Sequence, residues 1–298
     1  MVTRRQFIGN TAFLSLLTLT AAPVAMAAGR DGVGIAGMKA DIAAIERARG
    51  GRLGVAVLDL ATGDRVAWRG GERFASYSTF KFPLTAFILW RIDRGLEQAA
   101  RIIPYGKADL VSWSPVTAPQ VDKGGMSVRD LCEAQMIQSD NTAANLLLAA
   151  SGGPPALTDF LRGLGDKVTR SDRTEPTAND VPPGEQRDTT TPDAMLDLMR
   201  TLLFGDALSP AARGQLTAWL IDNRTGGKRL RAGMPGGWRV GDKTGGGDKG
   251  SNDIAILWPP AGGPLLVTGY YWNPAAGAEG RNAAFAELGA LIARRHGG

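Results

Sequence analysis

The sequence predicts an α+β protein in which one antiparallel sheet lies beside an inserted block of helices. Apolar residues alternate, as in strands, near both ends of the chain, over 52–70 and 237–274. The long segment between them, 78–204, carries apolar residues at helical spacing. A chain of 298 residues, 44% of them hydrophobic and 21% charged, can bury a large core. We therefore expect a five-stranded antiparallel sheet, built from both ends of the chain and flanked by the terminal helices.

The individual elements follow from this pattern. A helix is predicted over 38–49, and the segment 52–70 reads as two strands around the turn Thr62-Gly63-Asp64. Thr191 and Ser209, each followed by proline, are typical helix starts. Helices are predicted over 78–91, 127–138, 141–150, 154–163, 191–204 and 209–222, strands over 237–245, 252–260 and 264–274, and a last helix over 281–295.

We expect two lobes in the mature chain, 30–298. An α/β lobe takes about 30–75 and 213–298, and an all-helical lobe takes about 76–212, with a cleft between them. The segment 165–190 is rich in Pro, Asp and Thr and has no apolar periodicity. A loop of that length within a compact domain is usually functional or disordered.

The first 29 residues read as an export signal. Arg4-Arg5 precede a short apolar run over 12–22 and the small-residue exit Ala25-Met26-Ala27. The paired arginines resemble a twin-arginine leader, and the run is too short for a stable membrane anchor. Cleavage after about Ala27 leaves 34 − 2 = 32 basic and 29 acidic residues. The net charge of the mature protein is then +3. We expect the protein to be periplasmic or secreted, and to be a monomer.

Composition argues against several classes of function. No basic run or basic patch interleaved with aromatic residues stands out, so no nucleic-acid partner is expected despite a pI near 9.5. Cys132 is the only cysteine and His296 the only histidine. They can form neither an internal disulfide nor an ordinary zinc site, so we expect no metal and no cofactor.

Three short motifs occur in order along the chain: Ser78-x-x-Lys81, Ser139-Asp140-Asn141 and Lys243-Thr244-Gly245. Each has an ordinary structural explanation on its own, as a helix start, a cap between helices and a strand end. On a helix, residues three apart share a face, so Lys81 can reach the Ser78 hydroxyl. Lysine can then replace histidine as the group that accepts the serine proton.

The three motifs together resemble those of the serine β-lactamases and penicillin-binding proteins. The resemblance spans about 38–296, and the segments 110–117, 130–148 and 241–245 look like those of class A β-lactamases. It implies a β-lactamase/transpeptidase-like fold, a small β-lactam substrate of the penicillin or cephalosporin type, and an active site in the cleft. Whether carbapenems are also substrates stays open.

The resemblance also implies the roles of the motif residues. Ser78 would be the nucleophile, Lys81 its neighbouring amine, and Ser139 the group that relays a proton to the departing ring nitrogen. Asn141 would bind the substrate's side-chain amide, and Lys243 with Thr244 its carboxylate. The backbone N–H groups of Ser78 and Gly246 would form the oxyanion hole, and Gly245 would let substrate approach the strand edge.

Glu175 and Asn179 decide between hydrolysis and simple acylation. They match the family's E-x-x-x-N pattern, in which both side chains hold a water against the acylated serine. Glu175 precedes Pro176, where the family has a cis peptide. The resemblance also implies an ion pair between Arg173 and Asp188, whose spacing of fifteen residues matches the family's pairing, as a clasp at the neck of the loop. Without such a base the serine ester would persist, as in a DD-peptidase, a penicillin-binding protein or a non-hydrolysing β-lactam receptor. The alternatives stay open here, as does the choice of Lys81 or Glu175 as the acylation base.

Other positions are expected to tune the site. Trp113 takes the place of an aromatic residue at the family's active-site mouth, or is simply loop packing. Arg229 falls where some carbapenem-hydrolysing members have an arginine that assists carboxylate binding, or is a surface residue. Tyr77, next to the nucleophile, is unusual for the family. Cys132 is expected to be a buried free thiol because Thr85 occupies its partner position.

Overall fold

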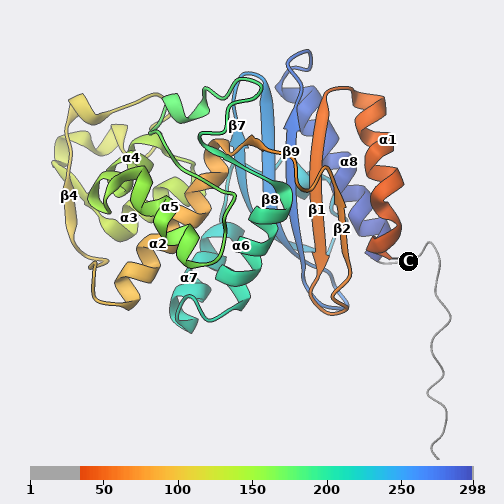
Figure 1. The fold of residues 1–298 in the computed structure, drawn as a ribbon. Coiled ribbons are helices and arrows are strands. Elements are labelled where there is room, and N and C mark those ends of the chain that lie inside the picture. Colours follow the sequence, from red (N-terminus) through yellow and green to blue (C-terminus); the bar gives the residue numbers. More distant parts are fainter. Residues whose placement is uncertain (1–33, 297–298) are drawn as a thin grey trace, which may run out of the picture. The chain divides into compact units, whose positions relative to one another are not determined.

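The structure, a computed structural model that describes residues 34–296, is organised around a five-stranded antiparallel sheet (Figure 1). The strand order is β2-β1-β9-β8-β7, so strands from both ends of the chain are hydrogen-bonded at the centre of the sheet. The α+β class and the five-stranded sheet predicted above are therefore confirmed. The strands are β1 (Arg52–Asp59), β2 (Arg65–Trp68), β7 (Arg239–Gly246), β8 (Gly250–Trp258) and β9 (Leu265–Trp272).

Alternate residues of the strands enter two separate cores, because successive side chains of a strand point to opposite faces. On β8, Ile254 and Ile256 pack with the long helical segment, whereas Ala255 and Leu257 pack with the terminal helices. Both faces of the central strands are thus covered. This explains why β8 and β9 are almost continuously apolar in sequence.

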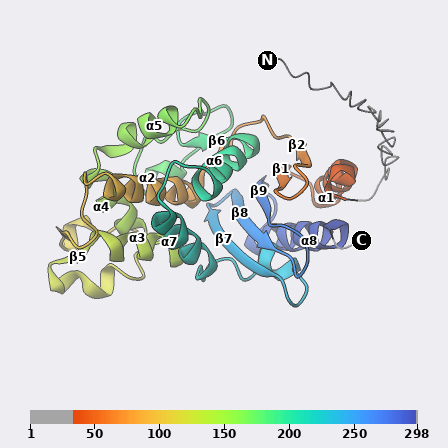
Figure 2. The same cartoon turned by 90° about the horizontal axis from the view of Figure 1, so that it is seen from below.

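Helices cover the two faces of the sheet unequally (Figure 2). Helices α1 (Lys39–Arg49) and α8 (Ala278–His296) lie together on one face. The other face meets the helices that lie between β3 and β7 in the chain. These are α2 (Lys81–Asp93), α3 (Val128–Ile137), α4 (Asn141–Ala150), α5 (Gly153–Gly163), α6 (Pro192–Phe204) and α7 (Pro210–Ile221).

Side-chain caps fix where four of these helices begin. Ser127, Asp140, Thr191 and Ser209 each accept a hydrogen bond from the backbone N–H three residues later. Thr191 and Ser209 are the two helix starts that the sequence indicated most clearly. Asp140 matters most for function, because it fixes the start of α4 between Ser139 and Asn141.

The structure corrects the sequence prediction at the nucleophile. The predicted α-helix over 78–91 begins instead at Lys81, and Ser78 lies in a preceding 3₁₀ turn, Tyr77–Phe80. Residues i and i+3 also align in a 3₁₀ turn, so Lys81 still faces Ser78. The last helix likewise begins at Ala278 rather than at 281.

Two short ribbons were not predicted. Strand β3 (Phe74–Ala75) pairs with β6 (Thr189–Thr190), and β4 (Ile102–Pro104) pairs with β5 (Gly125–Ser127). The second ribbon belongs to the segment that was expected to be wholly helical. Two or three residues are too few to show a period-2 pattern in sequence.

The predicted export signal, 1–29, lies outside the residues that the structure describes. Within 34–296 no helix combines the length and apolar character needed to cross a membrane. The division of 30–298 into lobes at about 76 and 212 stays a prediction.

Candidate active site

The centre of the candidate site is the pair Ser78 and Lys81. Lys81 is fully buried, and its Nζ donates to Ser78 Oγ at 2.9 Å. The 3₁₀ turn holds the serine ahead of α2, so its hydroxyl points toward the lysine on the next turn. The sequence prediction that Lys81 reaches Ser78 is thus confirmed.

The turn between α3 and α4 brings Ser139 and Asn141 to the same lysine. Lys81 Nζ is 2.9 Å from Ser139 O, 3.4 Å from Ser139 Oγ and 2.5 Å from Asn141 Oδ1. Ser139 has φ of 59°, a conformation that is uncommon for a residue other than glycine. Asp140 fixes this turn, because its carboxylate accepts from the N–H groups of Val116 and Ala143.

Strand β7 supplies the second lysine. Lys243 is fully buried and donates to Ser139 Oγ at 3.0 Å and to Thr244 O at 2.9 Å. The Thr244 hydroxyl is 2.5 Å from the hydroxyl of Thr225. Ser139 Oγ therefore lies between two amines, one from α2 and one from the sheet.

Burial governs the protonation of both lysines. Burial lowers the pKa of Lys81, and the nearby Glu175 carboxylate opposes this shift without reversing it. Burial, reinforced by repulsion from Lys81, holds the pKa of Lys243 well below that of an exposed lysine.

The 165–190 loop contributes Glu175, whose carboxylate is buried beside Lys81. Glu175 Oε1 is 3.3 Å from Lys81 Nζ, and Glu175 Oε2 accepts from Asn179 Nδ2 at 2.5 Å. The peptide bond from Glu175 to Pro176 is cis, as the resemblance implied. The ion pair lacks hydrogen-bond geometry, so among residues 34–296 no group donates a hydrogen bond to Oε1.

Asn145 is a positioning residue that the sequence analysis missed. Its side chain accepts from Glu175 N and donates to Glu175 O, both at 2.9 Å. It lies one helical turn after Asn141 on α4, so both asparagines point to the same side of the helix. This spacing was a usable signal, because two amides on one face can serve one site.

An ion pair closes the base of the 165–190 loop. Arg173 Nε donates to Asp188 Oδ2 at 2.6 Å, and Asp188 Oδ1 accepts from the N–H groups of Asp172 and Arg173. The Asp188 side chain is only 6% exposed, so this clasp is shielded from water. The Arg173–Asp188 pairing expected from their spacing is thus present.

The glycines after Lys243 approach the nucleophile's backbone closely. A Cβ on Gly245 would lie 3.1 Å from Ser78 N, so only glycine fits there without displacement. Gly246 is exposed at the end of β7, beside this contact. The edge of the strand is therefore open to a substrate at the point where the oxyanion hole was expected.

Arg229 is partly buried, and its Nη1 donates to Gly245 O at 2.7 Å and to Asn252 O at 2.5 Å. Trp113, by contrast, is 63% exposed, with its ring nitrogen donating to Gln138 O at 3.0 Å. Cys132 is buried and free, as predicted.

The arrangement suits acyl transfer by a serine hydroxyl. It combines a nucleophile in contact with an amine, a second amine near the same proton path, and a buried carboxylate with a free lone pair. Within 34–296 no cluster of three or more His, Cys, Asp or Glu side chains could hold a metal ion.

Comparisons with known proteins agree with this chemistry. The family model described as "Beta-lactamase enzyme family" matches residues 37–295. Beta-lactamase L2 of Stenotrophomonas maltophilia is 45% identical over 99% of both chains, and Beta-lactamase CTX-M-8 of Citrobacter amalonaticus is 40% identical over 97% of both.

Solved structures give the same result. The ancestral (GNCA) class A β-lactamase is 57% identical with a TM-score of 0.84, over 86% of this chain and 99% of that one. A β-lactamase from Xanthomonas campestris is 50% identical with a TM-score of 0.85, over 88% and 98%. The chain therefore belongs to the β-lactamase enzyme family, and within it to the class A β-lactamases.

Proposed function

We propose that this class A β-lactamase opens the amide of penicillin-type and cephalosporin-type antibiotics through an ester on Ser78 and hydrolyses that ester with water activated by Glu175. One observation carries the proposal. Glu175 Oε1 is buried next to Lys81, yet no group within 34–296 donates a hydrogen bond to it. A water molecule held there would find a proton acceptor beside the acylated serine.

The first half-reaction begins at Ser78. Its Oγ attacks the β-lactam carbonyl carbon while its proton passes to Lys81 Nζ, which is 2.9 Å away. Lys81 must be neutral at that moment. Its lowered pKa and the Glu175 carboxylate at 3.3 Å, which can take its extra proton, support this role.

Ser139 completes the ring opening. As the C–N bond breaks, the ring nitrogen takes a proton from Ser139 Oγ, and Lys81 or Lys243 restores it. The backbone N–H groups of Ser78 and Gly246 stabilise the oxyanion. Losing one such donor typically costs about 3 kcal/mol of transition-state stabilisation.

The substrate is held by groups around this centre. Lys243 and Thr244 receive its carboxylate, Asn141 binds its side-chain amide, and Trp113 borders the mouth. Arg229 supports the carboxylate site, because it binds the carbonyl of Gly245 next to Thr244. Through this contact Arg229 holds the end of strand β7 in position.

The second half-reaction distinguishes this proposal from its rivals. After Lys81 has given its proton to Ser139, it takes back the proton held by Glu175, which is then a carboxylate again. Glu175 takes a proton from water and the resulting hydroxide attacks the Ser78 ester. Ser78 Oγ leaves with a proton from Lys81, which restores the starting state. A DD-peptidase or a β-lactam receptor would stop at the ester. Asn145, Asn179 and the Arg173–Asp188 clasp together hold Glu175 at the site, which favours hydrolysis.

The test is to mix the mature protein with a chromogenic cephalosporin and follow turnover and protein mass together. We expect sustained turnover that a chelator does not change. A stable adduct at one equivalent with no turnover would contradict the proposal and favour a receptor or a DD-peptidase. We further propose that the enzyme acts as a monomer, exported through its twin-arginine signal and cleaved after about Ala27.

A further inference from the structure

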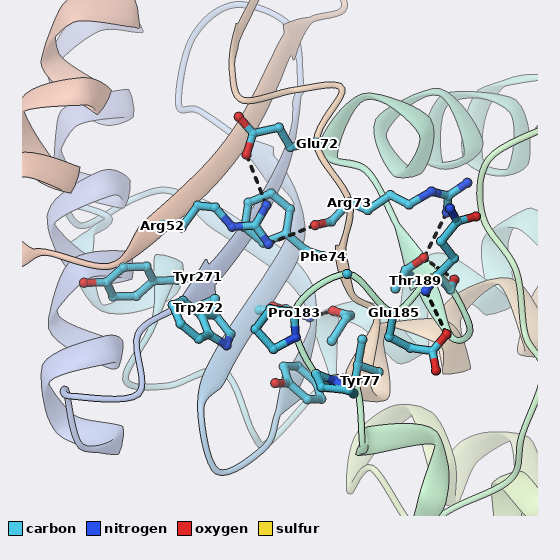
Figure 3. Close-up of a pocket in the computed structure, with 16 residues that line it drawn as sticks. Arg52, Glu72, Arg73, Phe74, Tyr77, Pro183, Glu185, Thr189, Tyr271 and Trp272 are labelled. Atoms are coloured by element: carbon cyan, nitrogen blue, oxygen red, sulfur yellow. Dashed lines mark hydrogen bonds and ion pairs between the residues drawn. The ribbon is translucent and has the colours of Figure 1, made fainter.

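A cavity lined in part by Tyr77, the residue before the nucleophile, has no part in the proposed reaction. Its volume is about 430 Å³, within the usual range for sites that bind small ligands. It is bordered by β3, the ends of β1 and β9, and the segment 181–189 (Figure 3). Tyr77 lines it, but Ser78, Lys81 and Glu175 do not. The cavity is therefore separate from the catalytic groups.

Aromatic rings and prolines form part of its wall. Phe74, Tyr77 and Trp272 line it together with Pro182 and Pro183 (Figure 3). Such flat, rigid surfaces suit a planar ring, because they bury its faces at little cost in side-chain entropy.

Several polar groups that line the cavity are hydrogen-bond donors. Arg52 stacks on Phe74, with its guanidinium carbon 4.0 Å from the ring centroid. The Tyr77 hydroxyl and the Trp272 ring N–H have no hydrogen-bond partner within the described part of the chain, 34–296. These donors favour a ligand that brings acceptor oxygens.

The two carboxylates that line the cavity are already neutralised. Glu72 pairs with Arg69 at 2.8 Å and with Arg52 at 3.1 Å, and Glu185 pairs with Arg187 at 2.6 Å. Arg73 also lines the cavity, but it donates only to the neutral oxygens of Val168 and Thr189. Arg73 therefore brings a positive charge that no carboxylate lining the cavity pairs with, and this charge favours an anion.

We propose that this cavity is a binding site for small aromatic carboxylates. The ring lies between Trp272 and the two prolines, and the carboxylate faces Arg52. The site stands apart from the hydrolytic mechanism, so its test does not depend on that mechanism.

Tyr77 connects the cavity to the catalytic centre. Its ring lies against Gly247 and Gly250, where an added Cβ would come within 2.6 Å and 2.8 Å of ring carbons. Its backbone, with φ of 42°, leads directly into Ser78. A ligand in the cavity would contact the residue that precedes the nucleophile.

The experiment is calorimetric titration of the full-length protein with 2-naphthoate, and with 2-naphthamide as the neutral control of equal shape. We expect 2-naphthoate to bind with a dissociation constant of about 1 mM or tighter, as ligand efficiency gives for a molecule of this size. The amide should bind at least about 10-fold more weakly, because it cannot pair with Arg52. Equal binding of the two compounds, or no binding of 2-naphthoate at about 10 mM, would overturn the proposal.

Variants locate the site. Trp272→Ala and Arg52→Gln should each weaken 2-naphthoate binding at least about 5-fold, whereas Ser78→Ala and the exposed Arg47→Ala should leave it unchanged. Trp272→Phe keeps an aromatic wall and should retain binding if the alanine variant does not fold. Displacement of 2-naphthoate by intact penicillin in Ser78→Ala would place the ligand in the catalytic cleft and refute the second site. If Trp272→Ala and Arg52→Gln both bind 2-naphthoate with unchanged affinity, the proposed site is also refuted.

Discussion

At the residue scale, Glu175 separates the two half-reactions. Glu175→Gln keeps the shape of the side chain and removes the proton acceptor, so acylation should proceed while hydrolysis of the ester slows by about 10²- to 10⁴-fold. Intact-mass measurement after mixing with benzylpenicillin should show the adduct accumulating. Glu185→Gln on the same loop is the matched control and should turn over normally. Unchanged steady-state hydrolysis in Glu175→Gln would remove Glu175 from the mechanism.

Lys243 leads to a prediction about pH. Burial and Lys81 lower its pKa, so its charge is lost at a lower pH than in an exposed lysine. Binding of the substrate carboxylate needs that charge, and kcat/KM should therefore fall as pH rises through the lowered pKa. Lys243→Arg keeps its charge to above about pH 12 and should move this alkaline limb upward. Lys249→Arg changes an exposed residue on the neighbouring turn and should leave the alkaline limb where it is. If the unaltered protein, Lys243→Arg and Lys249→Arg all lose kcat/KM at the same pH, Lys243 is not the group that titrates.

Asn145 should act on deacylation through Glu175. Asn145→Ala removes two hydrogen bonds to the Glu175 backbone, with an expected loss of about 2 kcal/mol in the free energy of unfolding. Guanidinium titration measures that loss, and single-turnover kinetics should show the ester breaking down more slowly while it forms at the normal rate. A defect confined to acylation would contradict the positioning role.

The sequence predicted the central side chains well because their roles depend on motifs with fixed internal spacing. Ser78 and Lys81 are three residues apart on one turn, so local geometry alone brings them together. Asn145 was missed because its partner, Glu175, is distant in sequence. The burial of Arg229 could not be read from its neighbours either, since it depends on the carbonyls of β7 and β8.

At the scale of elements, the 165–190 loop illustrates what composition can and cannot indicate. Its lack of periodicity correctly marked it as a loop, and the spacing of Arg173 and Asp188 indicated the clasp. The β3–β6 ribbon that holds its far end was not visible, because two-residue strands carry no pattern. The 3₁₀ turn at the nucleophile was missed for a related reason, since its first residues resemble an ordinary helix start.

The clasp gives a prediction for the whole loop. Asp188→Asn removes the charge that pairs with Arg173 and should lower the free energy of unfolding by about 3 kcal/mol, as expected for a largely buried pair. Glu175 should then lose its fixed position, so the ester on Ser78 should live longer. Thermal melting and burst kinetics measure the two effects. Melting and ester lifetime identical to those of the unaltered protein would show that the clasp does not hold the loop in place.

At the scale of the whole molecule, export is the prediction that the described residues leave untested. Replacing Arg4 and Arg5 by lysines should keep the enzyme in the cytoplasm, because the twin-arginine route reads the arginine pair. Cell fractionation with activity assays would measure where the enzyme is found. The N-terminal sequence of the exported protein should begin near Ala28. Normal export of the lysine variant would show that another route is used.

The order of the strands has a consequence for damaged copies of the gene. All the motif residues lie at or before position 246 of the chain. Strand β9, which joins β1 to β8, comes later, at Leu265–Trp272. A premature stop codon just before β9 would leave two hairpins with no shared neighbour, and the backbone N–H and C=O groups on one edge of β1 and of β8 would stay unpaired. A bacterium carrying such an allele should be drug-susceptible, although a search for the three motifs would score it as resistant.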